Sequence, residues 1–372
     1  MTFFRIGLTA MTVCLAVAAP AAAEASSGYV VIMKAGSADA LANRHGGTVE
    51  HRYSTVLQGF SARMTAKQAR SLAADPAVDY VVADTPVRAL GEQLNPPWGL
   101  DRIDQRTLPL DSRYRYNTTS PNVHAYVIDT GVKATHQDFG GRVSGGYDFV
   151  DNDTDPTDGN GHGTFVAGIV GGKTYGVAKQ VKIVPVRVLN NSGSGTISGV
   201  IAGIDWVTRN AVKPAVANMS LGGSANQALD DAVRRSIASG VTYSVPAGSS
   251  ASLASNFSPA RVAEAITSAA VDRNDCVSRS SNHGPAVDLY APGVLITGPW
   301  ITSDTATVTI TGTSLAAAHV SGGAALYLGL HPTATPAKVQ TALVSSASPG
   351  VCNLPPNSPN RILFTGPPPR NF

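Results

Sequence analysis

Three short glycine-flanked segments carry an aspartate, a histidine and a serine, in that order along the chain. They are Asp129-Thr130-Gly131, His162-Gly163-Thr164 and Gly312-Thr313-Ser314. A serine hydroxyl becomes a nucleophile when a histidine takes its proton, and a carboxylate beside that histidine holds it in the required tautomer. The segments therefore predict a serine nucleophile (Ser314), its general base (His162) and an orienting carboxylate (Asp129).

The sequence between these segments alternates short apolar runs with helical patterns. The runs are apolar on both faces, which is typical of parallel strands covered by helices on both sides. We therefore expect an α/β fold with a mainly parallel sheet flanked by helices. The expected strands are 123–128, 181–189, 216–220, 241–245 and 265–271. The expected helices are 164–170, 197–210, 229–239 and 314–330.

The N-terminal quarter of the chain is expected to contain two further parts. Residues 1–23 have a positive charge at Arg5, a short apolar run and small residues at 21–23, which predicts a signal peptide. Residues 24–90 read as a small α+β unit with the order βαββαβ, the ferredoxin-like motif. Thr65 and Gln68 form a capping-box pattern that opens its second helix. The remaining residues, 91–372, are expected to form the main domain.

Charge, hydropathy and cysteine content indicate which partners and which cellular location to expect. The net charge of +3 includes no basic run, so we expect no nucleic-acid partner. The apolar run of the leader is shorter than the ~20 residues of a membrane-spanning helix, so we expect no membrane anchor and a secreted, extracellular protein. Cys14 leaves with the leader, and Cys276 and Cys352 remain. They form either a disulfide or two free thiols.

The motifs resemble those of the subtilisin-like serine peptidases, and most closely their proteinase K-like secreted bacterial members. The resemblance covers nearly the whole chain. It rests on Val127–Gly131, Asn160–Thr164, Asn218–Gly223 and Gly312–Ala316. It implies a secreted serine endopeptidase with a catalytic triad of Asp129, His162 and Ser314. The unit at 24–90 resembles the inhibitor propeptide of this family, and we expect self-cleavage near Leu90, between Arg88 and Leu94.

The same resemblance implies a peptide-binding cleft and a metal site. Gly193, Ser194 and Gly195 would pair with an extended substrate on one side, and Ser220, Leu221 and Gly222 on the other. Asp288 and the carbonyl groups of Ala263 and Ala265 would hold a structural Ca²⁺ ion, which prefers oxygen ligands. The acidic stretch from Asp148 to Asp158 either attracts calcium or forms a solvated loop. The expected partners are protein or peptide substrates and the chain's own propeptide, and we expect a monomer.

The sequence departs from the family around the serine. The family usually takes one oxyanion donor from an asparagine, and here Ser249 stands in its place, beside the backbone N–H of Ser314. Phe165, Leu315 and Ala318 also replace the family's common residues. A catalytically weak peptide-binding homologue therefore stays open as an alternative. A third reading is a metal-dependent hydrolase that uses Asp129, His136 and His162.

Overall fold

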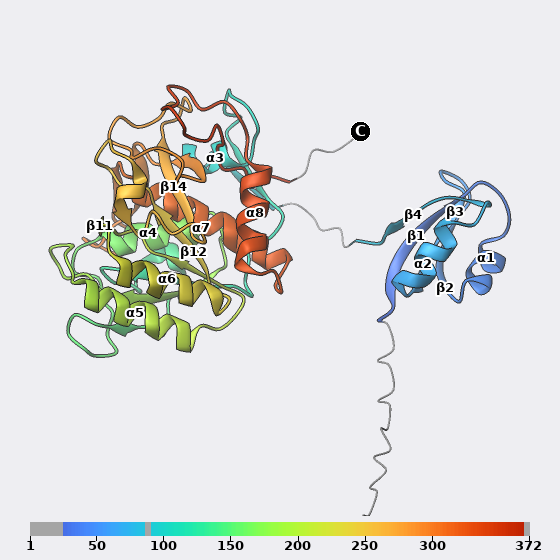
Figure 1. The fold of residues 1–372 in the computed structure, drawn as a ribbon, viewed down its shortest axis with the longest axis horizontal. Helices are drawn as coiled ribbons and strands as arrows, with labels where there is room; N and C mark the ends of the chain where they lie inside the picture. Colours follow the sequence, from blue (N-terminus) through green and yellow to red (C-terminus); the bar gives the residue numbers. More distant parts are fainter. Residues whose placement is uncertain (1–24, 86–90, 368–372) are drawn as a thin grey trace, which may run out of the picture. The chain divides into compact units, whose positions relative to one another are not determined.

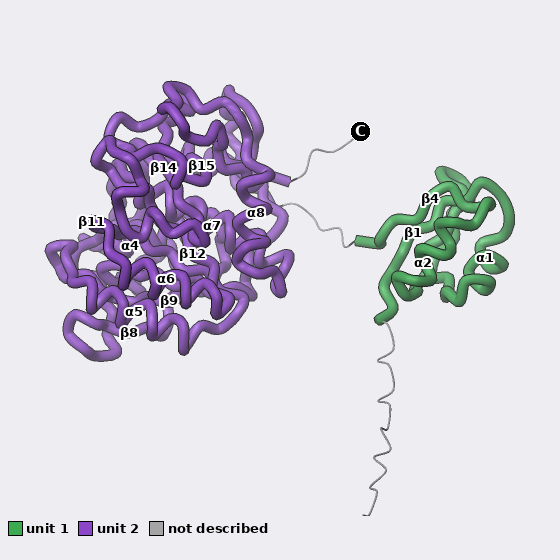
Figure 2. The backbone as a smooth tube through the Cα atoms, in the orientation of Figure 1, with its two compact units in different colours: residues 1–88 green, residues 89–372 purple. Residues whose placement is uncertain are grey.

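The computed structural model describes residues 25–85 and 91–367, and the chain divides into two compact units, residues 1–88 and 89–372 (Figure 2). The predicted signal peptide over residues 1–23 lies outside the described residues, and so do residues 86–90 of the predicted cleavage region. No helix among the described residues is long and apolar enough to cross a membrane.

The first unit has the predicted order βαββαβ. Its elements are β1 (Ser27–Met33), α1 (Ala38–Arg44), β2 (Thr48–Tyr53), β3 (Gly59–Met64), α2 (Ala66–Ala73) and β4 (Val78–Ala83). The strands form one antiparallel sheet in the order β2-β3-β1-β4. The capping box is present, since Gln68 N donates to Thr65 Oγ1 at 3.3 Å and Thr65 N donates to Gln68 Oε1 at 2.7 Å. The ferredoxin-like expectation is confirmed.

The second unit is built on a seven-stranded parallel sheet with the strand order β15-β14-β12-β10-β7-β9-β8. Strands β12 and β14 of this sheet are labelled in Figure 1, together with the helices around them. Its strands are β7 (His124–Asp129), β8 (Tyr147–Asp148), β9 (Lys182–Arg187), β10 (Ala215–Asn218), β12 (Thr242–Pro246), β14 (Ile266–Val271) and β15 (Leu289–Pro292). The helices are α3 (Trp98–Ile103), α4 (His162–Gly171), α5 (Ile197–Asn210), α6 (Gln227–Ala238), α7 (Thr313–Leu330) and α8 (Pro336–Ser346). Three two-stranded sheets pair β5 (Gly91–Leu94) with β6 (Arg113–Tyr116), β11 (Gly223–Ser224) with β13 (Phe257–Ser258), and β16 (Ile296–Pro299) with β17 (Thr307–Ile310).

Both faces of the large sheet are buried, as the apolar runs predicted. Val127 of β7 packs in the core that contains Val166 of α4 and Val320 of α7. The next residue, Ile128, packs in a second core with Val200 of α5. Alternate side chains of a strand point to opposite faces, so α4 and α7 cover one face while α5 and α6 cover the other. The predicted α/β class is confirmed.

Two of the expected helix limits were wrong at the functionally important end. Helix α4 begins at His162, two residues before the predicted start, and α7 begins at Thr313. Gly161 caps α4 with a φ of 115°, a conformation that favours glycine. His162 and Ser314 therefore both lie in the first turn of a helix.

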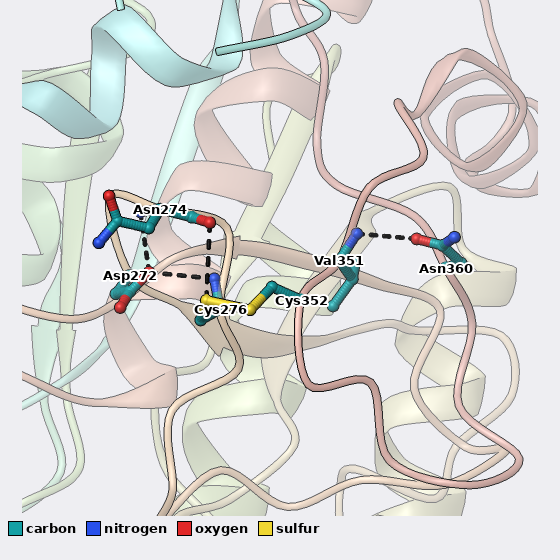
Figure 3. The surroundings of a disulfide bond; sticks show 6 residues. All are labelled: Asp272, Asn274, Cys276, Val351, Cys352 and Asn360. Atoms are coloured by element: carbon teal, nitrogen blue, oxygen red, sulfur yellow. Dashed lines mark hydrogen bonds between the residues drawn. A yellow bond between two sulfur atoms is a disulfide. The ribbon is translucent and has the colours of Figure 1, made fainter. Parts of the chain in front are cut away.

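The two remaining cysteines form a disulfide between Cys276 and Cys352, 76 positions apart in the sequence (Figure 3). Cys276 N donates to Asp272 Oδ1 at 3.0 Å, which fixes the turn before the first cysteine (Figure 3). A buried ion pair lies one residue before this cysteine, where Arg102 Nε of α3 meets Asp275 Oδ1 at 2.6 Å. The disulfide and the ion pair thus tie the start and the end of the second unit to the same turn.

Candidate active site

The predicted carboxylate and histidine meet at the carboxyl end of strand β7. Asp129 is the last residue of that strand and is fully buried. Its Oδ1 accepts hydrogen bonds from Thr130 N and from His162 Nδ1, both at 2.8 Å. The bond places the ring proton on Nδ1 and leaves Nε2 as the acceptor, which is the tautomer that a general base requires.

Two opposing effects act on the protonation of His162. Burial disfavours the imidazolium, but the negative charge of Asp129 and its hydrogen bond favour it more strongly. The pKa of His162 is therefore raised above its usual value. The histidine can hold a transferred proton while its carboxylate partner stays buried beside it.

Ser314 lies in the first turn of α7, where free backbone N–H groups and the helix dipole favour negative charge. Its Oγ donates to the carbonyl oxygen of Ser220 at 3.2 Å, and Ser220 Oγ donates back to the carbonyl oxygen of Ser314 at 2.8 Å. Within the described part of the chain, no hydrogen bond joins Ser314 to His162. Catalytic hydrogen bonds of unliganded enzymes are often absent or long.

Two adjoining hollows surround these residues. A hollow of about 620 Å³ is lined by His162, by residues 193–195 and by residues 220–222. A smaller hollow of about 250 Å³ is lined by Ser249, Thr313 and Ser314, and it shares residues 220–223 with the first. The structure thus brings the predicted substrate segments, the base and the nucleophile to one cleft.

Ser249 lies in the smaller hollow with the nucleophile. Its Oγ is 3.2 Å from Oγ1 of Thr313, the residue before Ser314, and either hydroxyl can be the donor. When Thr313 donates, the Ser249 proton is free to point into the hollow. The Ser249 hydroxyl therefore lies in the same hollow as Ser314.

Comparisons with known proteins assign two parts of the chain to known families. The profile described as "Subtilase family" matches residues 122–364, and the profile described as "Peptidase inhibitor I9" matches residues 26–90. The chain belongs to the subtilase family.

Relatives and a solved structure extend this result. An extracellular serine proteinase of Thermus sp. (strain Rt41A) is 52% identical over 86% of this chain and 78% of its own length. Alkaline serine exoprotease A of Vibrio alginolyticus is 48% identical over 88% of this chain and 62% of its own length. A crystal structure of a cold-adapted subtilisin-like serine proteinase, 51% identical, matches 74% of this chain and all of its own with a TM-score of 0.72. The protein is a subtilisin-like serine endopeptidase with an inhibitor propeptide.

Asp158 joins the segments that carry Asp129 and His162, although its sequence context indicated only an acidic stretch. It is buried, and its Oδ1 accepts hydrogen bonds from Gly161 N and Thr130 Oγ1, both at 2.9 Å. Its Oδ2 accepts from Thr164 N at 2.9 Å. These contacts hold the turn that carries His162 against the turn that follows Asp129. Its place four residues before His162 was the only signal in the sequence.

Asn282 is a second residue that the sequence analysis missed. It is fully buried, and its Nδ2 donates to the carbonyl oxygen of Ala247 at 2.8 Å. Its Oδ1 accepts from Ser250 N at 2.9 Å and from Ser252 N at 3.1 Å. The side chain therefore supports the loop that carries Ser249 from both sides. Nothing in the local sequence signals this, because the contacts join segments 30 or more residues apart.

The other departures from the family lie in the core of the protein. Phe165, Leu315 and Ala318 are all buried in the apolar cluster between the sheet and helices α4 and α7. They lie within the first two turns of these helices. None of them is among the residues that line the two hollows.

The metal-dependent alternative is not supported by the described residues. Among them, no group of three or more His, Cys, Asp or Glu side chains is placed to hold a metal ion. Both ring nitrogens of His136 are engaged: Nε2 contacts the carbonyl oxygen of Ala306 at 3.0 Å, and Nδ1 accepts from Asp138 N at 3.2 Å. In the acidic stretch, Asp148 and Asp151 both bind Arg187. These carboxylates form an ion-pair cluster.

The residues expected to hold calcium surround a hydrogen-bond donor. The carbonyl oxygens of Ala263 and Ala265 and the carboxylate of Asp288 do converge, as the resemblance implied, but they converge on the side-chain amide of Gln340. A nitrogen donor thus fills the centre, and the residues present do not fit a calcium ion in this arrangement.

Proposed function

We propose that Asp129, His162 and Ser314 form the catalytic triad and hydrolyse peptide bonds through an acyl-enzyme. Ser314 Oγ attacks the carbonyl carbon as its proton passes to His162 Nε2. The tetrahedral intermediate collapses when His162 gives this proton to the leaving amine. A water molecule then repeats the sequence on the acyl-enzyme. The observation that carries the proposal is the 2.8 Å bond between His162 Nδ1 and Asp129 Oδ1.

The nucleophile has to change its partner before it reacts. Its hydroxyl donates to the carbonyl oxygen of Ser220 in the unliganded protein, and rotation about the Cα–Cβ bond would turn it toward His162. The developing oxyanion would be stabilised by Ser314 N–H and by the Ser249 hydroxyl. A hydroxyl is shorter than the amide that it replaces, so we expect slower catalysis than in relatives with asparagine there.

The cleft supports binding of an extended peptide. Residues 193–195 and 220–222 offer backbone groups on opposite sides of the larger hollow, which suits β-strand pairing with a substrate. The smaller hollow contains Leu221, Phe257 and Ala260, and none of its lining side chains is charged. We expect a large apolar side chain on the residue that precedes the cleaved bond.

We further propose that the enzyme is a secreted, self-processed and monomeric zymogen. The first unit has a hydrophobic core of its own, and it matches the inhibitor profile over residues 26–90. Cleavage near Leu90 would separate it from the second unit after export directed by residues 1–23. As an inhibitor propeptide, it would keep the enzyme inactive until it is degraded.

The test is expression of residues 24–372 with and without Ser314→Ala. We expect the unmodified chain to release the propeptide and to react with a fluorophosphonate at Ser314, while Ser314→Ala accumulates as full-length protein. Normal cleavage of Ser314→Ala would show that another protease processes the chain. Labelling without peptide hydrolysis would favour the weak peptide-binding homologue, the alternative that Ser249 suggests.

A further inference from the structure

Helix α8 reaches a cluster of oxygen atoms on the loop before strand β14 and on the residue before strand β15. Gln340 Nε2 lies 3.0 Å from the carbonyl oxygen of Ala263, 3.2 Å from that of Ala265 and 3.5 Å from Asp288 Oδ1. All three partners are acceptors. The carboxamide must therefore present its nitrogen, because its oxygen would be repelled by all of them.

Asp288 is held rigidly in this cluster. Its Oδ2 accepts from Thr267 N at 2.8 Å, while its own backbone N donates to the carbonyl oxygen of Thr267 at 2.9 Å. These two bonds fix the carboxylate at the edge of β14 and leave Oδ1 pointing toward Gln340. The Asp288 side chain is only partly accessible to water, so its oxygens depend on these protein donors.

We propose that the Gln340 carboxamide takes the place of a cation in this chain. Hydrogen bonds from Gln340, and no metal ion, then join helix α8 to the cluster of oxygen atoms. An amide nitrogen carries two N–H donors, and the two carbonyl oxygens are its nearest acceptors. A Ca²⁺ ion needs six to eight oxygen ligands at 2.3–2.6 Å, and the nitrogen stands where these ligands would have to converge.

The proposal predicts that a change of Gln340 creates a calcium site. Gln340→Glu replaces the donor by a carboxylate beside Asp288, so the cluster then has two carboxylates, two carbonyl oxygens and no donor. We expect this variant to be less stable than the unmodified chain in EGTA because the like charges repel. Excess calcium should raise its thermal midpoint by about 5 °C. Gln340→Ala, which leaves space and the three acceptors, should show a smaller gain.

Thermal unfolding is measured on the full chain carrying Ser314→Ala, which prevents autolysis. Its three tryptophans, Trp98, Trp206 and Trp300, all belong to the second unit, so their fluorescence reports on that unit. Lys338→Ala is the matched control, since it changes the net charge by the same amount on the same helix and its exposed side chain lies outside the cluster. We expect it to show no more calcium dependence than the unmodified chain.

Asp288→Asn decides between the possible results. In the Gln340→Glu background it should abolish the gained calcium response, and in the unmodified background it should leave the response to calcium unchanged. The proposal is overturned if the unmodified chain is stabilised by calcium and Asp288→Asn removes that effect, because calcium would then already bind here. It is equally overturned if Gln340→Glu responds to calcium no more than the unmodified chain does.

Discussion

Replacement of Ser249 by asparagine tests how this subtilase stabilises the oxyanion. In the structure the Ser249 hydroxyl is hydrogen-bonded to Thr313 at 3.2 Å and lies in the same small hollow as Ser314. The longer amide of asparagine would extend further into that hollow. We therefore expect Ser249→Asn to raise kcat and Ser249→Ala to lower it.

The two expected effects differ in size. In subtilisin itself, loss of the asparagine donor lowers kcat by about 10²–10³, a value that belongs to that enzyme. Ser249→Asn should recover a part of this factor. A neutral hydrogen bond contributes about 1 kcal/mol net, so Ser249→Ala should lower kcat by only about fivefold. KM should change less in both variants, because the bond matters mainly in the transition state.

The assay is steady-state hydrolysis of a chromogenic peptide, with the concentration of active enzyme determined by fluorophosphonate titration. Ser252→Ala is the matched control: it lies in the same loop, Asn282 holds it through its backbone N–H, and it lines neither hollow. We expect this control to keep the kcat of the unmodified enzyme. If Ser249→Ala loses nothing and Ser249→Asn gains nothing, the oxyanion is stabilised by other groups and the reasoning is refuted.

Three further outcomes are expected. Because the pKa of His162 is raised and only the neutral ring accepts a proton, kcat/KM should fall as pH drops through a value above 6.5. Asp129→Asn should move the midpoint of this pH profile down and lower kcat by about 10⁴. An unmoved midpoint would contradict the assignment of Asp129 and His162. Asn282→Ala should lower kcat by a factor about tenfold larger than its effect on KM, and Asn282→Asp should restore part of the lost kcat. If the two variants lose the same amount of kcat, the side chain only supports the fold. Replacement of Cys276 and Cys352 by serine should reduce the free energy of unfolding by about 4 kcal/mol, measured in denaturant, and an unchanged midpoint would show that the bond does not stabilise the protein.

Much of the fold could be predicted because its signals are local. The apolar runs identified the buried strands, and the capping box at Thr65 identified the start of a helix. The start of α4 was missed because the apolar pattern begins only at Phe165, whereas the helix already begins at His162, directly after its N-cap Gly161 with a left-handed φ. Backbone conformation at a single glycine is decided by the turn around it, which periodicity does not report.

Residue types and their order along the chain were enough to predict the available chemistry: a serine, a histidine and an aspartate. Asp129, His162 and Ser314 stand on turns at element ends, and a parallel sheet brings such ends to one edge. This is a property of topology, so the contact of Asp129 with His162 could be expected from the position of each motif.

Contacts between side chains far apart in the sequence could not be predicted in this way. Asn282 reaches back to Ala247, and Gln340 reaches back across 77 positions to Ala263. The pairing of Cys276 with Cys352 was likewise open until the two segments were placed side by side. A hydrogen bond requires a donor and an acceptor within about 3 Å. That proximity results from the packing of distant segments, which neither composition nor local pattern encodes.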